Sequence, residues 1–211
     1  PVLIGECQND SIKQVFVEKA KSENAPICFA QDYETLDFLC ELRGVYQEKN
    51  KHTVMVAFTL LLQLGFEISD AALRDGFLQV TERTGLKGRW QELSSLPRVV
   101  CDTGHNEAGI REVVKQIEKE HFDTLRIVFG MVSDKDISSV LALLPRDAVY
   151  YFTKAQIPRA LSEEDLKKKA EKYALKGECF ASVEEALFHA KCDGCVIDYH
   201  SVVVSKFVVE V

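Results

Sequence analysis

Residues 85–106 read GLKGRWQELSSLPRVVCDTGHN and contain the features that decide the fold of this chain. The apolar run at residues 99–101 predicts a buried strand, and the polar cluster DTGHN at 102–106 follows it directly. Apolar residues then recur at helical spacing, at Ala108, Ile110, Val113, Val114 and Ile117. The order of strand, tight polar turn and helix start is typical of an open α/β sheet, which binds ligands at the carboxyl ends of its strands. Asp102 offers an acceptor for hydroxyl groups there, and the helix N-terminus offers N–H donors for an anion.

The rest of the chain alternates between apolar strands and amphipathic helices. Before residue 88 we expect strands at 2–4 and 26–30, one helix that Asp10 or Ser11 caps, one over 50–64, and one that Ser69-Asp70 caps and that reaches Val80. After residue 90 we expect strands at 98–102, 125–129, 148–152, 178–180 and 195–204, with helices between them. This alternation predicts a Rossmann-like, mostly parallel sheet that is flanked by helices. Gly85 and Gly88 mark the expected domain boundary.

The composition argues against several classes of protein. The 211 residues are 46% hydrophobic and 28% charged, which is ordinary for a globular protein with a sizeable core. A net charge of −7 argues against nucleic acid or an anionic membrane as the main partner. No apolar run approaches the roughly 20 residues that cross a bilayer, and the start lacks the pattern of a signal peptide. We therefore expect a cytoplasmic protein.

The seven cysteines are scattered along the chain, which suits reduced thiols better than a disulfide framework. Cys192-Asp-Gly-Cys195, with His200 nearby, is the best candidate for a metal or redox motif. A structural zinc site needs four ligands, however, and no second pair of ligands is visible. We interpret Asp-Gly as a turn and expect the cysteines to be free of metal.

Motifs that bind phosphate are missing from this sequence. Neither G-x-x-x-x-G-K-[ST] nor G-x-G-x-x-G occurs, and the nearest candidates, GLKG at 85–88 and KG at 176–177, have the wrong spacing and no hydroxyl residue after lysine. The 211 residues therefore contain no recognisable loop that cradles nucleotide phosphates.

Five motifs in one order resemble folylpolyglutamate synthase, often also dihydrofolate synthase, in the Mur ligase superfamily. They are LIGE at 3–6, GVYQ at 44–47 followed by Asn50, GRW at 88–90, DTGHN at 102–106, and FGM at 129–131 leading to DKD at 134–136. In that family the phosphate loop, the magnesium ligands and a modified lysine lie in a central domain. The resemblance implies that residues 1–88 are the tail of that α/β ATP-binding domain and that residues 89–211 form the Mur ligase-type C-terminal domain.

The resemblance also implies roles for four residues. Asn50 matches the family asparagine near adenine, Arg89 the arginine that reaches the nucleotide phosphates, and Asp102 the aspartate that holds the ribose hydroxyls. His105 matches the histidine near the incoming glutamate and the transferred phosphate. These roles suit the side chains, because an amide reads a base edge and a guanidinium forks onto phosphate. Each residue also has a structural interpretation: helix capping for Asn50 and Asp102, a surface ion pair for Arg89, and a backbone-bonded helix start for His105.

One segment departs from the family. There the last strand ends in a glycine-containing turn before an apolar helix, and Ser205 matches the start of that helix and a residue of the glutamate site. Val203 and Val204 stand where the glycines belong, and β-branched residues resist the backbone conformations that glycine adopts. The role of Ser205 in binding glutamate is therefore open. Lys135, between Asp134 and Asp136, is equally well explained as a structural feature of its loop, so we do not count it among the catalytic residues.

The expected function is part of an ATP-dependent ligase that adds glutamate to folate, with dihydrofolate synthesis as an open addition. In such ligases ATP converts a substrate carboxylate into an acyl phosphate, which the amine of glutamate attacks, and positioning and charge neutralisation do most of the work. The expected cofactors are ATP and magnesium, with the magnesium ligands mainly upstream. We expect a monomer that is inactive as these 211 residues alone. The alternatives are a cell-wall Mur ligase and a stand-alone α/β module that binds a nucleotide or a partner.

Overall fold

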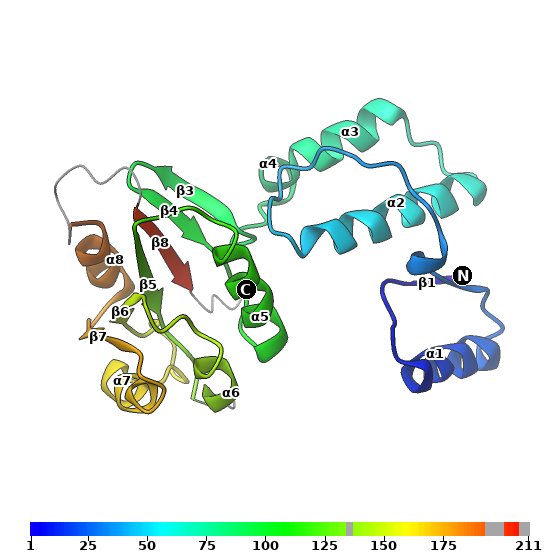
Figure 1. The fold of residues 1–211 in the computed structure, drawn as a ribbon. Helices are drawn as coiled ribbons and strands as arrows, with labels where there is room; N and C mark the ends of the chain where they lie inside the picture. The colour runs from blue at the N-terminus through cyan, green and yellow to red at the C-terminus, as the bar shows by residue number, and fades with distance from the viewer. Residues whose placement is uncertain (134–136, 193–200, 207–211) are drawn as a thin grey trace. The chain divides into compact units, whose positions relative to one another are not determined.

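The computed structural model describes residues 1–133, 137–192 and 201–206, the last group by its main chain. The chain forms two compact units, Pro1–Leu86 and Lys87–Val211, and each is described by itself (Figure 1). The division lies next to the boundary expected at Gly88. Within the described residues, no helix combines the length and the apolar character that a membrane span requires.

The Lys87–Val211 unit contains a six-stranded sheet in the order β3-β4-β8-β5-β6-β7. The strands are β3 (Gln91–Ser95), β4 (Arg98–Cys101), β5 (Thr124–Phe129), β6 (Val149–Phe152), β7 (Lys176–Cys179) and β8 (Ser201–Lys206). β3 and β4 are antiparallel, and the other neighbours are parallel. The predicted mostly parallel sheet is therefore confirmed.

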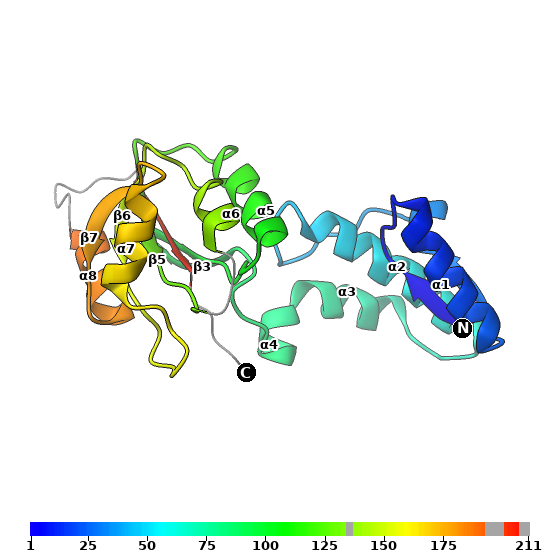
Figure 2. The same cartoon turned by 90° about the horizontal axis from the view of Figure 1, so that it is seen from below.

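Helices cover both faces of this sheet. They are α5 (Glu107–Ile117), α6 (Ile137–Leu141), α7 (Glu163–Glu171) and α8 (Val183–Cys192). Alternate residues of β5 point to opposite faces, as strand geometry requires. Ile127 and Phe129 pack in the larger core cluster with α5, α6 and α7, whereas Val128 packs with Ala186 of α8. Figure 2 shows α5 and α6 next to each other, above the sheet in that view.

Two features of this unit differ from the sequence-based expectation. Strand β3 was not expected, because QELSS has a single apolar residue, Leu93. In the structure that side chain is 51% exposed. The helix start expected at Ser205 is wrong, because Ser205 and Lys206 continue β8. Ser205 pairs with Cys101 of β4 and Val128 of β5, so the valines that replace the glycines extend the strand.

The Pro1–Leu86 unit has a two-stranded parallel sheet and four α-helices within its described residues. Its elements are β1 (Val2–Ile4), α1 (Asp10–Ser22), β2 (Ile27–Phe29), the 3-10 helix η1 (Ala30–Asp32), α2 (Gln47–Gln63), α3 (Asp70–Leu78) and α4 (Val80–Thr84). The cap expected at Ser69 is confirmed, since its hydroxyl accepts the N–H of Ala72. The cap of α1 is Asn9 rather than Asp10 or Ser11, because its side chain accepts the first free N–H groups. A break at Gln79 separates α3 from α4, where one helix was expected.

Candidate functional site

The side chain of Asp102 joins two loops at the carboxyl end of β4. Its Oδ2 accepts the backbone N–H of Trp90 at 2.8 Å, and its Oδ1 accepts the backbone N–H of Gly104 at 2.8 Å. The residue is 3% exposed. One carboxylate therefore connects the GRW turn at 88–90 with the DTGHN loop at 102–106.

Thr103 adds a second set of contacts between the same loops. Its N–H and its hydroxyl both donate to the carbonyl of Gly88, at 2.9 and 3.1 Å. The guanidinium of Arg89 donates to the Thr103 hydroxyl, and its Nη1 lies 3.4 Å from the Gly88 carbonyl. Thr103 was not expected as the partner of Arg89, and its place inside DTGHN is the only signal of this contact in the sequence. Among the described residues, Arg89 makes this hydrogen bond rather than the surface ion pair of the structural interpretation.

Gly88 is required by the close approach of these loops. Its φ is +69°, a left-handed conformation that side chains rarely adopt. A Cβ atom at this position would lie 2.4 Å from Cγ2 of Thr103. The glycine of the GRW motif thus lets the turn pack against the loop after β4.

Trp90 anchors the GRW turn in the core, although its φ of 52° is unusual for a bulky residue. Its side chain is 5% exposed and packs in the larger core cluster. Nearby, Glu120 accepts hydrogen bonds from Arg98 at 2.6 Å and from Gln116 at 2.8 Å. Burial by itself raises the pKa of Glu120, but the hydrogen bonds from Arg98, Gln116 and the Trp90 side chain outweigh it and hold that pKa below its usual value.

The N-terminus of α5 lies at the same edge. Asn106 caps the helix, because its side chain accepts the N–H of Gly109 at 2.8 Å. His105 precedes the cap and is exposed, with its Nδ1 3.3 Å from the carbonyl of Thr103. The cap role considered for Asp102 thus belongs to Asn106. The edge presents a guanidinium, an imidazole and the positive end of a helix dipole, which together suit an anionic ligand.

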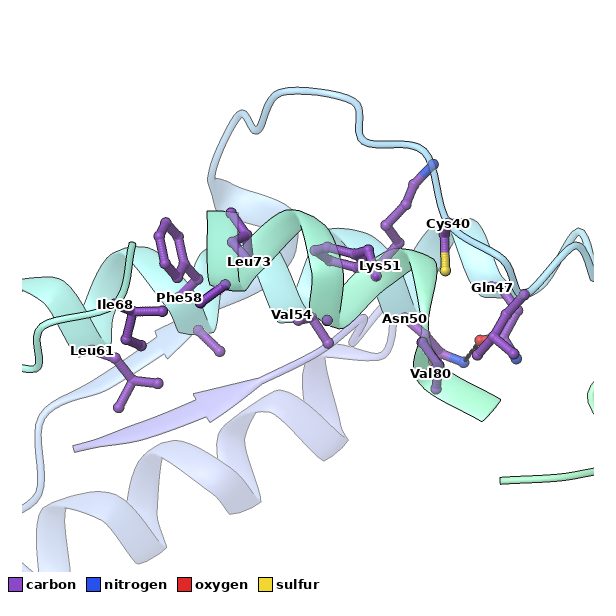
Figure 3. A pocket seen from close by; sticks show the side chains of 15 residues that line it. Cys40, Gln47, Asn50, Lys51, Val54, Phe58, Leu61, Ile68, Leu73 and Val80 are labelled. Atoms are coloured by element: carbon purple, nitrogen blue, oxygen red, sulfur yellow. Dashed lines mark hydrogen bonds between the residues drawn. The ribbon is translucent and has the colours of Figure 1, made fainter. Parts of the chain in front are cut away.

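Asn50 belongs to the other unit, whereas Arg89, Asp102 and His105 lie together at one sheet edge. It lies in the first turn of α2, which begins at Gln47, so the capping interpretation of Asn50 is wrong. Its Nδ2 donates to Oε1 of Gln47 at 2.9 Å. Both residues line one end of an apolar cavity of about 490 Å³, which α2 and α3 enclose with Val54, Phe58 and Leu73 (Figure 3).

For some of the expected residues the structure describes only the main chain or nothing at all. The main chain of Ser205 lies beside Cys101, one residue before Asp102, and its side chain is not described. Lys135, Cys195 and His200 lie outside the described residues. In the parts of the chain that the structure describes, six cysteines have free thiols, and no three His, Cys, Asp or Glu side chains gather as metal ligands.

A family model identifies the domain to which this sheet belongs. The model of the Mur ligase, glutamate ligase domain matches residues 88–196, which contain Arg89, Asp102 and His105. The chain belongs to the Mur ligase family. The matched glutamate ligase domain begins at Gly88 and therefore includes the whole GRW turn.

Two curated relatives both carry folylpolyglutamate synthase in their names. The chain is 28% identical over 202 residues to a protein of Haloferax volcanii named as a probable bifunctional folylpolyglutamate synthase/dihydropteroate synthase, with 92% of this chain and 23% of the relative covered. It is 32% identical over 142 residues to the dihydrofolate synthase/folylpolyglutamate synthase of Escherichia coli K12, with 65% of this chain and 31% of the relative covered. The chain thus spans less than a third of the length of these relatives.

Solved structures agree with the fold. The Mycobacterium tuberculosis folylpolyglutamate synthase complexed with ADP superimposes with a TM-score of 0.79 at 20% identity, and the alignment covers 97% of this chain and 51% of that one. E. coli FolC in complex with DHPP and ADP gives a TM-score of 0.75 at 24% identity, with 98% and 50% covered. At these identities the likeness establishes the fold.

Proposed function

We propose that this chain is the glutamate-ligating part of an ATP-dependent enzyme that adds glutamate to folate. The observation that carries the proposal is the pair of loops at the carboxyl edge of β4, in which Asp102 and Thr103 hold the GRW turn against DTGHN inside a glutamate ligase domain. The relatives with the same domain are named for folylpolyglutamate synthesis, which favours folate over a cell-wall precursor as the acceptor.

The cationic groups at this edge suit the phosphates of ATP. ATP, when bound, supplies the phosphoryl group that activates the acceptor carboxylate. Arg89 holds the phosphates with its guanidinium, which Thr103 orients. His105 and the α5 N-terminus face the transferred phosphate and the incoming glutamate, where they stabilise negative charge. The resemblance assigns Asp102 to the ribose hydroxyls. In the structure its oxygens accept the backbone N–H groups of Trp90 and Gly104, so it also holds the main chain of the two loops.

Asn50 and Ser205 complete the proposed ligand contacts. The Asn50 amide lines one end of an apolar cavity and suits a base edge such as that of adenine. The main chain of Ser205 pairs with Cys101, next to the loop after β4. Ser205 therefore stays a candidate for the glutamate site. Magnesium is expected with ATP, but the described residues offer no set of ligands for it. The resemblance to folylpolyglutamate synthase places the metal ligands mainly upstream of this chain.

The Pro1–Leu86 unit is proposed to be the tail of a central ATP-binding domain. Two observations support this origin. Parallel sheets occur almost only in α/β folds in which helices cover both faces of the sheet. The parallel sheet of this unit has only two strands, β1 and β2, which is little for its helices to cover. In addition, the apolar face of α1 is open, with Ile12 51%, Val15 63% and Phe16 38% exposed. We place the enzyme in the cytoplasm as a monomer that binds no nucleic acid.

The test is turnover of the complete enzyme that contains this chain, measured as ADP release with folate and glutamate. Arg89→Ala should lower turnover by about 10²–10³, because losing a charged contact to the reacting phosphates costs about 2–4 kcal/mol. Arg146→Ala is the matched control, since Arg146 is exposed and lies between α6 and β6. Near-normal turnover in Arg89→Ala, or glutamate transfer to a cell-wall precursor and none to folate, would refute the proposal.

A further inference from the structure

We propose that Thr103 is a positioning residue whose hydroxyl turns the guanidinium of Arg89, so that the Nε–Nη2 edge of that side chain meets the nucleotide phosphates. The inference rests on the proposed function, in which Arg89 binds the phosphates. The family resemblance gives Arg89 that role and gives Thr103 none.

The hydrogen bonds of the Thr103 hydroxyl carry the inference. A hydroxyl has one proton to donate and two lone pairs that accept. The Thr103 hydroxyl donates its proton to the carbonyl of Gly88 at 3.1 Å, and the Thr103 N–H donates to the same carbonyl at 2.9 Å. Because its proton is engaged there, the hydroxyl meets Nη1 of Arg89 as an acceptor. The Gly88 carbonyl thus sets the direction of the bond between Thr103 and Arg89.

The guanidinium of Arg89 is held through one of its three nitrogen atoms. Among the described residues, both hydrogen bonds of this side chain leave from Nη1, one to the Thr103 hydroxyl and one of 3.4 Å to the Gly88 carbonyl. A guanidinium has five N–H groups in a planar fork, of which Nη1 carries two. The Nε–Nη2 edge therefore keeps the geometry that matches two oxygens of a phosphate. The side chain is half-buried, so this edge is within reach of a ligand.

The main chain on both sides of Arg89 is already fixed. Gly88 is buried and packs against Cγ2 of Thr103, and the side chain of Trp90 is 5% exposed in the core. The Arg89 side chain is the part that still has rotamer freedom, and losing that freedom on binding a ligand weakens the binding. The hydrogen bond to Thr103 restricts the side chain before the nucleotide arrives. Thr103 therefore lowers the entropy cost of binding the phosphates.

The first measurement is kcat/KM for ATP in the complete enzyme that contains this chain, at saturating folate and glutamate. Thr103→Val keeps the shape of the side chain and removes the hydroxyl, whereas Thr103→Ser keeps the hydroxyl and removes the methyl group beside Gly88. Thr103→Val should lower kcat/KM for ATP on the order of tenfold, because a hydrogen bond to a charged group is lost. Thr103→Ser should restore most of that loss. The two variants therefore separate the hydroxyl from the packing of the side chain.

The second measurement repeats Thr103→Val in the Arg89→Ala background of the same enzyme. If Thr103 acts through Arg89, the valine has no further effect there, because the side chain that it orients is already missing. A threonine that only stabilises the loops would lower kcat/KM by the same factor in both backgrounds. The proposal is overturned by equal factors in the two backgrounds, by a wild-type kcat/KM in Thr103→Val, or by a loss in Thr103→Ser as large as that in Thr103→Val.

A failure of the proposed function looks different, because the wild-type enzyme then releases no ADP with folate and glutamate. NMR relaxation of the arginine Nε–H groups in the whole 211-residue chain still decides the positioning role. The order parameter of Arg89 should exceed that of exposed Arg146, fall to the Arg146 value in Thr103→Val, and stay high in Thr103→Ser. Fluorescence of the single tryptophan, Trp90, checks that each variant is folded. An Arg89 order parameter that is the same in the wild type and in Thr103→Val would overturn the proposal.

Discussion

The two units of this chain bury their apolar residues to very different extents. Of the seventeen large hydrophobic side chains that are exposed among the described residues, thirteen belong to Pro1–Leu86 and four to Lys87–Val211. Of the thirty-three buried hydrophobic residues in the described part of the chain, seven lie in the first unit and twenty-six in the second. The second unit has a closed core, and the first has the elements of an α/β domain without enough sheet to cover them.

This difference shows what a parallel sheet requires. In the second unit, α5, α6 and α7 cover one face and α8 covers the other, so strands β5 and β6 are buried on both sides. In the first unit, the sheet has two strands of three residues each, and Ile12, Val15 and Phe16 on the apolar face of α1 stay exposed. Regular secondary structure is present in both units, but only the second encloses it.

The largest expected effect is on local stability. In hydrogen exchange on the whole chain, the amides of β5 should be protected on the order of 10³ more than those of α1 and α2, because the closed core must unfold before β5 exchanges. Mass spectrometry of exchanged peptides resolves the two units in one sample. Equal protection in α2 and β5 would break the comparison and show that the first unit has a complete core of its own.

A matched pair of core substitutions should follow the same division. Phe129→Ala in β5, where the side chain is 1% exposed, should lower the free energy of unfolding by about 3–5 kcal/mol through loss of burial and a new cavity. Phe66→Ala, where the side chain is 57% exposed, should change it by less than about 0.5 kcal/mol. Urea denaturation followed by Trp90 fluorescence and circular dichroism gives both values. A large cost at Phe66 would mean that this side chain is covered.

The junction between the units allows a smaller and sharper test. Gly85 and Gly88 have nearly equal φ values of +70° and +69°, but a Cβ at Gly85 meets no atom within 4 Å. Gly85→Ala should therefore cost about 1 kcal/mol, for the backbone alone. Gly88→Ala adds the clash with Thr103 and should cost about 1–3 kcal/mol more, with a shift in Trp90 fluorescence. Equal costs in thermal melts would contradict the close contact between the GRW turn and DTGHN.

The smallest effect concerns the pH dependence of the second unit. Because the folded-state pKa of Glu120 lies below its usual value, its ion pair with Arg98 stabilises the fold above the ordinary glutamate pKa of about 4.3. That contribution is lost as the pH falls through the lowered folded value. Glu120→Gln should reduce stability at pH 7 by at most about 1 kcal/mol and flatten the decline below pH 4. Glu118→Gln, at an exposed position, is the control in urea melts at both pH values.

Local patterns explain which elements could be predicted. The helical spacing after residue 106 predicted α5, and Ile110, Val113 and Ile117 are buried as that spacing requires. Strand β3 escaped prediction because it is an edge strand with little apolar character, paired on one side with β4. The cap of α1 was also missed by one residue, because Asn9, Asp10 and Ser11 are all residue types that cap helices and the apolar pattern does not choose among them.

The sequence by itself determined the order of most strands and helices, the family of the domain, and the grouping of Arg89 and Asp102 in neighbouring motifs. These properties follow from short-range spacing, which the sequence displays directly. Only the tertiary structure decided that β8 lies between β4 and β5, and that the carboxylate of Asp102 receives the amide of Trp90 from twelve residues away. In both cases the local sequence of a segment does not indicate which segment it contacts. Strand order and side-chain direction depend instead on which surfaces meet when the core closes.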